Sequence, residues 1–353
     1  QPQEGCSGSR VSTDRERRRM LLRLTHTTSG AAHDGRSVLA LAAAQLGSSS
    51  LFASAGHSAD IRLWRATAAG IEPSGEIRPG GGSVFSLEAS PLPGGDCLLL
   101  AGSFSRVVFA WRLREEPGGG TAVNPLWQSA QHTGWVRALA IDPAEAAAAP
   151  RAAYSIGCNR ILSWAPPLPP PDAPAASGVT AQDEIALYED EEQVRSKDIL
   201  CLAASTGGAL AAGSVDGRVR CWRVGSNGVP TGVPVRWAAH AGRVSCVRFT
   251  PGGGGLLTAG LDGAVKRWAH ACSPGGARLL SQSALLPRVH SLALAGGHVH
   301  AGVEGEVVSL EGESLSEVGR VALPPREAGA EAEASGAPRV TALATGRGLH
   351  GAL

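Results

Sequence analysis

The chain has 353 residues, of which 43% are hydrophobic, and its 47 glycines and 23 prolines divide it into short segments. With 32 basic and 31 acidic residues the formal net charge is +1, which excludes a general electrostatic attraction to nucleic acid or to an anionic membrane. No apolar run approaches the roughly eighteen residues that a membrane-spanning helix needs, so no membrane insertion is expected. Abundant apolar residues between Gly- and Pro-rich turns indicate a folded protein of short strands.

One four-residue phrase occurs seven times along the chain: Val or Ile, any residue, a small residue, then Leu or Val. Successive copies start 45 to 63 residues apart. The copies start at Val38, Val84, Val136, Ile199, Val244, Val289 and Val340. A unit of this size repeated over nearly the whole length predicts a single repeat domain covering residues 1–353.

Each unit carries three further strand signals after this phrase. A second apolar run bounded by small residues follows first, for example at 51–55 and 256–259. A β-branched residue three positions before a large apolar residue comes next, as with Ile61 and Trp64, and most units end with a fourth apolar stretch, such as 233–237. Four antiparallel strands leave apolar faces that only neighbouring sheets can bury. The pattern therefore predicts an all-β fold, a seven-bladed β-propeller with four-stranded antiparallel blades.

The two ends of the chain are predicted to share the seventh blade. Val340 starts an inner strand, with room for a second near 349–353. Residues 1–25 are expected to supply the outer strands, around 9–13 and 20–24. Hydrogen bonds between the two ends would close the ring without a free sheet edge.

The fifth unit carries the most complete motif. His240 precedes its first strand, Thr258 ends the second, Asp262 lies in the following turn, and Trp268 lies in the third strand. With these residues the chain resembles the WD-repeat (β-transducin) family over almost its whole length. The resemblance implies a seven-bladed propeller in which these four residues form a structural hydrogen-bonded tetrad. Other units are degenerate, with Ala212 in the hydroxyl position of the fourth. The Asp position elsewhere holds Ser58, Ser105, Cys158 and Glu304.

No catalytic or metal-binding constellation stands out, so we expect no enzymatic activity, no cofactor, no metal and no small-molecule substrate. The Ser, His and Asp residues that invite a triad fall in turns that recur with the repeat, and no G-x-S-x-G elbow is present. The glycine clusters lack the lysine and following helix of a phosphate cradle. His298 and His300 share one side of a predicted strand, but no third ligand is placed near them.

The cysteines are odd in number and include no CxxC pair, which disfavours a zinc site and a disulfide framework. Cys201 and Cys246 occupy the small position of the repeated phrase, which is a core position. An intracellular, reducing compartment is expected, and the cytoplasm, the nucleus and an organelle such as the chloroplast all stay open.

One face of the propeller is the first candidate for partner binding. The resemblance implies that residues flanking the repeated Val line the face most often used by the family. There the sequence predicts an arc of arginines and an apolar patch, which together have the composition of protein interfaces, although some of the aromatics could instead pack between blades. The candidate residues are Phe85, Phe104, Trp135, Arg137, Arg243, Arg288, His290 and Arg339.

An insertion at 165–192 in the third complete blade is the second candidate. It begins Pro-rich and ends acidic, which fits either an outer strand with solvated flanks or a docking strip presented to a basic partner by a polyproline spacer. The family's topology implies that it lies on the face opposite Asp262. The strip comprises Asp183, Glu184, Tyr188, Glu189, Asp190, Glu191 and Glu192.

Two functions follow from these surfaces. The preferred hypothesis is a non-catalytic protein–protein interaction scaffold, a subunit of a multi-subunit complex with protein partners. The alternative is an RNA-associated propeller subunit, for example in ribosome assembly, that binds through the arginine arc and a basic cluster at 15–19. Steep loss of binding with salt would favour RNA, and salt-insensitive association would favour protein.

Overall fold

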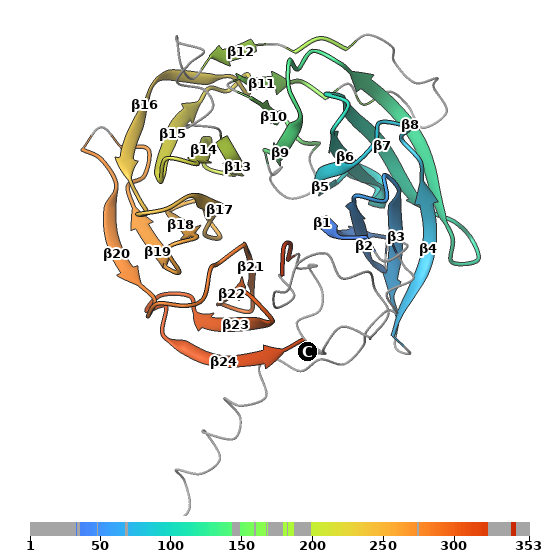
Figure 1. The fold of residues 1–353 in the computed structure, drawn as a ribbon. Helices are drawn as coiled ribbons and strands as arrows, with labels where there is room; N and C mark the ends of the chain where they lie inside the picture. The colour runs from blue at the N-terminus through green and yellow to red at the C-terminus, as the bar shows by residue number, and fades with distance from the viewer. Residues whose placement is uncertain are drawn as a thin grey trace, which may run out of the picture.

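The computed structural model of the chain describes most of the repeat region. The described residues are 33, 36–47, 49–67, 70–142, 149–158, 160–166, 168, 179–181, 183–186, 199–273, 275–323 and 340–343. They form six four-stranded antiparallel sheets arranged as blades around a common axis (Figure 1). The predicted all-β propeller of four-stranded blades is thus confirmed.

Each blade takes its strands from the inside outward in chain order. Blades 1 to 3 consist of β1 (Val38–Leu46), β2 (Ser49–Gly56), β3 (Ile61–Ala66), β4 (Ile71–Ile77), β5 (Val84–Pro91), β6 (Cys97–Ser103), β7 (Val108–Glu115), β8 (Thr121–Ser129), β9 (Val136–Ile141), β10 (Ala153–Gly157), β11 (Arg160–Trp164) and β12 (Asp183–Ala186). Blades 4 to 6 consist of β13 (Ile199–Ser205), β14 (Ala209–Ser214), β15 (Arg218–Val224), β16 (Pro230–Ala238), β17 (Val244–Phe249), β18 (Gly255–Gly260), β19 (Val265–Ala269), β20 (Arg278–Gln282), β21 (Ser291–Ala295), β22 (His298–Gly302), β23 (Glu306–Glu311) and β24 (Glu317–Ala322).

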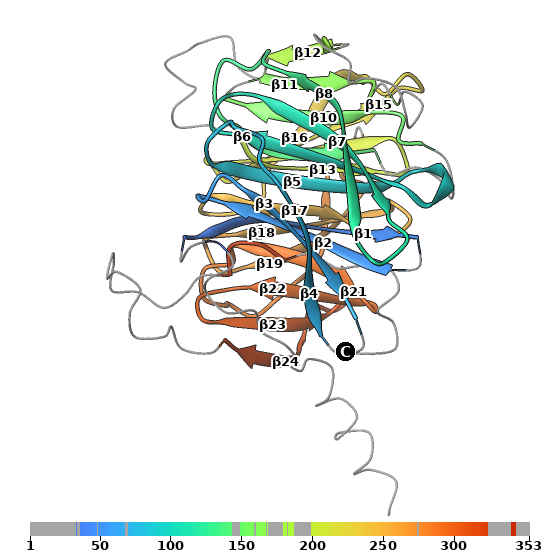
Figure 2. The ribbon, with the colours of Figure 1, turned by 90° about the vertical axis from the view of Figure 1, so that its right-hand side faces the viewer.

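The inner strands run from one face of the ring to the other, as β5 and β13 do in the side view of Figure 2. On one face, the turn between the second and third strands meets the start of the first strand. Backbone hydrogen bonds join them from Phe104 N to Ser83 O at 2.8 Å and from Leu261 N to Arg243 O at 3.0 Å. We call this face, where the inner strands begin, the upper face.

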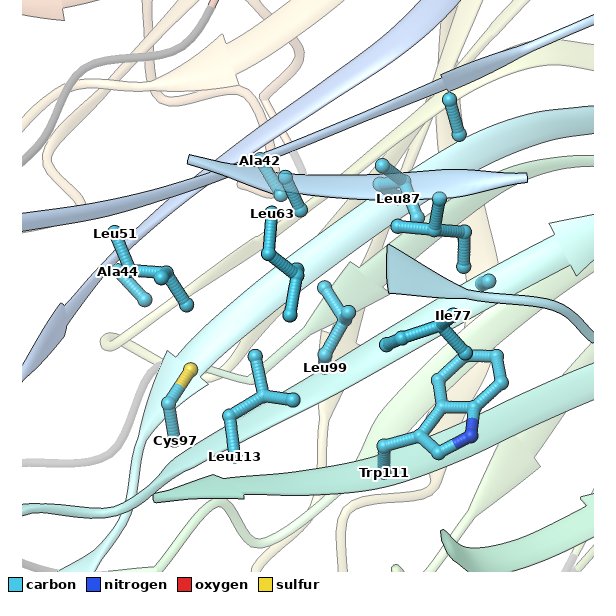
Figure 3. Close-up of a cluster of buried hydrophobic side chains, with 14 of the residues drawn as sticks. Ala42, Ala44, Leu51, Leu63, Ile77, Leu87, Cys97, Leu99, Trp111 and Leu113 are labelled. Carbon is cyan, nitrogen blue, oxygen red and sulfur yellow. The ribbon is translucent and has the colours of Figure 1, made fainter. Parts of the chain in front are cut away.

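The apolar core lies between neighbouring blades. The cluster between blades 1 and 2 joins Leu63 of β3, Leu99 of β6 and Trp111 of β7, and the Trp111 ring lies beside Ile77 (Figure 3). Four further clusters fill the remaining gaps between successive blades, from blades 2 and 3 to blades 5 and 6. Each fully buried leucine contributes roughly 1.5–3 kcal/mol, so a blade depends on its neighbours for stability.

The structure shows six blades rather than the seven expected, and closure of the ring is not shown. Residues 1–25, expected to supply outer strands, and 344–353 lie outside the described residues. Of the predicted seventh inner strand only 340–343 are described, and none of these four is in a strand. A strand requires paired neighbours, and the segments expected to pair with 340–343 are not among the described ones. The single domain over 1–353 stays a prediction.

Residues 340 and 341 nevertheless contact both blade 6 and blade 1. Val340 N donates to Val303 O at 3.1 Å, and Val340 O accepts a hydrogen bond from Ser291 Oγ at 2.9 Å. Thr341 Oγ1 donates to Val38 O at 2.6 Å, across 303 residues of sequence. The start of the seventh repeat is therefore held between the last and first described blades.

The same contact recurs between other neighbouring blades. Ser245 Oγ donates to Val289 O at 2.6 Å, and Ser86 Oγ donates to Val136 O at 3.5 Å. In each case a small residue of one inner strand binds the carbonyl of the repeated Val in the next unit. Val340 O accepts from Ser291 Oγ in the same way.

One disulfide corrects the expectation drawn from the cysteines. Cys221 of β15 is bonded to Cys272, which follows β19, with their Cα atoms 5.2 Å apart. The bond joins blades 4 and 5, and its partners lie 51 residues apart, so no short spacing marked them in the sequence. A disulfide is not typical of a reducing compartment, and the compartment stays a prediction.

Within the described part of the chain, no helix is long and apolar enough to cross a membrane.

Candidate functional site

The predicted tetrad of blade 5 lies beneath the upper face as a hydrogen-bonded chain. Trp268 Nε1 donates to Thr258 Oγ1 at 3.0 Å, and His240 Nε2 lies 2.8 Å from the same oxygen. His240 Nδ1 lies 2.9 Å from Asp262 Oδ1. Gly263 follows with a φ of 83°, and a Cβ there would collide with Leu286 O, so the turn requires glycine.

Burial and hydrogen bonding set the charge states of this pair. Burial lowers the pKa of His240, although Asp262 opposes the shift. Burial raises the pKa of Asp262, but hydrogen bonds from His240 and from the backbone N–H groups of Ala241 and Ala264 outweigh it and leave the pKa lowered. A neutral histidine hydrogen-bonded to an ionised aspartate stabilises the turn.

Blade 3 contains a Trp–hydroxyl–His triplet of the same kind, which the sequence analysis missed. Trp164 Nε1 donates to Ser155 Oγ at 2.7 Å, and His132 Nε2 lies 2.7 Å from that oxygen. Burial lowers the pKa of His132 to about 4, so its ring is neutral at neutral pH. The spacing could have revealed it, because His132 precedes Val136 by four residues, as His240 precedes Val244.

Blade 1 contains a third triplet. Trp64 Nε1 donates to Ser54 Oγ at 2.7 Å, and His33 Nε2 lies 2.8 Å from that oxygen. His33 Nδ1 lies 2.7 Å from Ser58 Oγ, so a serine occupies the place of the aspartate. Blades 1 and 3 therefore keep the Trp–hydroxyl–His hydrogen bonds although their sequences lack the complete motif.

Blades 4 and 6 depart further from the tetrad. In blade 4 the Ser214 hydroxyl donates to Asp216 Oδ1 at 2.5 Å and accepts from Arg220 Nη1 at 3.1 Å. In blade 6 His300 Nδ1 lies 2.8 Å from Ser309 Oγ, and His298 Nδ1 lies 2.9 Å from Gly296 O. Among the described residues no group of three His, Cys, Asp or Glu side chains could hold a metal ion.

A β-bulge near the start of most inner strands changes the direction of one side chain at the upper face. In five inner strands the register shifts at the residue after the repeated Val or Ile. A bulge leaves that residue unpaired and re-aims its side chain. The bulged residues are Leu39, Phe85, Arg137, Leu200 and Ser245, and all five are half-buried rather than part of the core.

Three of the predicted aromatic residues form one cluster on the upper face. Phe104 and Trp135 have ring centroids 4.8 Å apart, and Phe85 stacks on Trp135 at 5.7 Å with an interplanar angle of 21°. Phe85 and Phe104 are 6.3 Å apart. We call Phe85, Phe104 and Trp135 the aromatic cluster. Its rings come from β5, the turn between β6 and β7, and the residue before β9, so it bridges blades 2 and 3.

The outer members of this cluster are open to solvent. Phe104 is 48% exposed and Trp135 is 42% exposed. The guanidinium of Arg137 lies over Trp135, with Cζ 5.3 Å from the ring centroid. His57 approaches the edge of Phe85 at 6.5 Å. Phe104 and Trp135 are therefore exposed, whereas Phe85 is half-buried.

The predicted arginine arc lies on other blades of the same face. Arg243 and Arg288 are exposed, and His290 is half-buried. Arg339 lies outside the described residues. The structure thus brings the aromatic cluster and Arg137 together, and places Arg243, Arg288 and His290 at the starts of blades 5 and 6.

The acidic strip begins in an outer strand and not in a loop. Asp183 and Glu184 belong to β12, and Arg160 Nη1 lies 2.5 Å from Glu184 Oε1. The structure therefore favours the outer-strand alternative for 183–186. Residues 187–192, which include the other five members of the strip, lie outside the described residues.

Ala186 ends β12 opposite Arg160, and Ile199 starts β13. The expected location of the strip, on the face opposite Asp262, stays a prediction for 187–192.

Two comparisons with known proteins complete these observations. The family model described as WD domain, G-beta repeat, matches residues 192–223 and 233–269, which include most of blade 4 and much of blade 5. A search of curated proteins found no match. WD40 repeats matched in two blades, within a propeller built from four-stranded sheets, are consistent with the WD-repeat family.

Proposed function

We propose that this protein is a non-catalytic scaffold that binds protein partners through the upper face, as a subunit of a larger assembly. WD40 propellers are typically protein-interaction scaffolds, and the aromatic cluster is the observation that carries the proposal here. Trp135 and Phe104 keep nearly half of their surface in water, while Trp111, Trp164 and Trp268 are buried.

The cluster has the features of a binding hot spot. Exposed Trp, Phe and Arg side chains are enriched where proteins bind one another. The mutual stacking of Phe85, Phe104 and Trp135 orders the rings before any partner arrives, which reduces the entropy lost on binding. The bulge that aims Phe85 and the short turns that carry the other two rings are fixed by the blades beneath them.

Affinity capture from native extract tests the proposal. The double substitution Phe104→Ala and Trp135→Ala should abolish capture of the partner, because loss of one aromatic hot spot typically costs 2 kcal/mol or more, or about thirtyfold in affinity. Leu279→Ala is a matched control, since Leu279 is 45% exposed but lies on the outer strand β20. Capture that survives the double substitution in a folded propeller would reject the proposal.

The RNA-associated alternative has one supporting observation. Arg243 and Arg288 are both exposed at the starts of adjacent blades, where a phosphate backbone could contact them. Binding that falls steeply with salt and is lost in Arg243→Gln with Arg288→Gln, but not in the aromatic variant, would favour RNA over protein.

A further inference from the structure

The segments that carry the aromatic cluster contain arginine but no carboxylate. These segments are 78–85, 104–107 and 130–137, and all of their residues are described. Their fully charged side chains are Arg78, Arg106 and Arg137. In a chain whose formal net charge is only +1, this is a local excess of positive charge.

Two of these three arginines are not neutralised by the protein. Arg78 pairs with Glu76, with Nε 2.5 Å from Oε1. In the described part of the chain, neither Arg106 nor Arg137 forms an ion pair, and the guanidinium of Arg137 lies over the Trp135 ring. The aromatic cluster is therefore flanked by two arginines that can take a carboxylate partner.

Two carboxylates elsewhere on the upper face, Asp262 and Asp216, are already engaged within the protein. Asp262 accepts hydrogen bonds from His240 and from the backbone N–H groups of Ala241 and Ala264. Asp216 accepts from Ser214 Oγ and from Arg218 N. Arg243 and Arg288, by contrast, form no ion pair with any described residue, so their charges add to the positive potential of the face.

From this arrangement we infer that the segment bound at the aromatic cluster is an acidic peptide with apolar anchors: large apolar side chains that pack on Phe104 and Trp135, flanked by Asp or Glu that meet Arg106 and Arg137. The inference rests on the proposed function and specifies its partner. Apolar contact supplies most of the affinity, and the arginines select acidic sequences and speed association.

The stacking around Trp135 favours a peptide over single-stranded RNA. Binding of single-stranded RNA by stacking requires a free aromatic face on which a base can lie. Trp135 already stacks with Phe85 and carries the guanidinium of Arg137 at 5.3 Å, so a base would have to displace one of them. Apolar side chains can instead pack against the exposed edges of Trp135 and Phe104.

Selection from a random-peptide display library tests this inference on the full-length protein. Peptides enriched on the wild-type protein should combine aromatic or branched apolar residues with flanking Asp or Glu. The enrichment should be lost on Trp135→Ala with Phe104→Ala and retained on Leu279→Ala. Enrichment of basic or uncharged peptides by the cluster would overturn the inference.

Binding of the most enriched peptide, measured by fluorescence polarisation, separates the contributions. Arg106→Gln and Arg137→Gln should each weaken binding about two- to fivefold, as expected for exposed ion pairs. Arg278→Gln, an exposed arginine on β20, should have no effect. A counterpart peptide with Asn and Gln in place of Asp and Glu should bind more weakly at low salt, and the two should converge as salt rises.

The remaining outcomes distinguish the inference from the proposed function. If the uncharged peptide binds the cluster as tightly as the acidic one, the acidic partner is rejected while binding through the upper face stands. Tighter binding of a single-stranded RNA, lost with Trp135, would overturn both. Self-association of the protein that is lost in the aromatic variant would identify a second copy as the occupant and overturn the inference.

Discussion

Removal of the Ser155 hydroxyl is the most direct perturbation of the Trp–hydroxyl–His triplets. Ser155 is fully buried, and its Oγ binds both Trp164 Nε1 and His132 Nε2 at 2.7 Å. Ser155→Ala leaves two buried polar groups without their shared partner. Each such group costs about 1–3 kcal/mol, so we expect a loss of roughly 2–6 kcal/mol in the free energy of unfolding.

Ser163 provides a matched control in the same blade. It is also buried, but its Oγ has no hydrogen-bond partner among the described residues. Ser163→Ala removes a hydroxyl that gains nothing in the fold, so its effect should lie within about 0.5 kcal/mol of zero or be stabilising. The two variants are chemically identical substitutions with opposite expected outcomes.

Equilibrium unfolding in urea, followed by tryptophan fluorescence and by circular dichroism, measures both effects. The midpoint of Ser155→Ala should shift to lower urea with an unchanged slope, and that of Ser163→Ala should not. If Ser155→Ala costs no more than Ser163→Ala, the hydrogen-bonding role of the triplet is refuted.

Three further predictions concern pH and the ends of the chain. Because the pKa of buried His132 is lowered to about 4, the free energy of unfolding should fall by about 2 kcal/mol as the pH drops from 7 to 5. His132→Gln should remove this fall, and an equal fall in both proteins would contradict the prediction. Burial raises the pKa of Glu88, although Arg248 opposes the shift, so the free energy of unfolding of the wild-type protein should decline as the pH rises through that pKa. Glu88→Gln should remove this decline, and an unchanged dependence of the free energy of unfolding on pH would contradict the prediction. Thr341→Val removes the hydrogen bond to Val38 O and should lower the free energy of unfolding in urea by about 0.5–1.5 kcal/mol. Deletion of 1–25 should make the unfolding transition less cooperative. If both variants unfold as the wild-type protein does, a seventh unit between blades 6 and 1 is contradicted.

The inner strands could be predicted closely from sequence because the repeated phrase encodes their burial. Five of the six begin at its Val or Ile, and only β21 begins two residues later, at Ser291. The first residue of the phrase is buried against a neighbouring blade in most units, as Val84 and Val244 are. A pattern of this kind depends on local alternation, and local alternation is visible in sequence.

Other features depend on contacts between units and were harder to predict. The partners of the disulfide lie in successive blades, and His33 stands five residues before its Val instead of four. The exposure of Phe104 and Trp135 depends on the geometry of the connections that carry them, before β7 and before β9. The sequence could select these residues as candidates but could not separate a surface cluster from packing between blades.

Oxidative footprinting of the protein in complex with its captured partner tests the central claim most directly. If the upper face is the binding surface, Trp135 and Phe104 should be strongly protected from oxidation in the complex, while Leu279 and Val233, exposed on outer strands, should be labelled as in the free protein. Protection of the outer strands, with Trp135 and Phe104 labelled as in the free protein, would contradict the account.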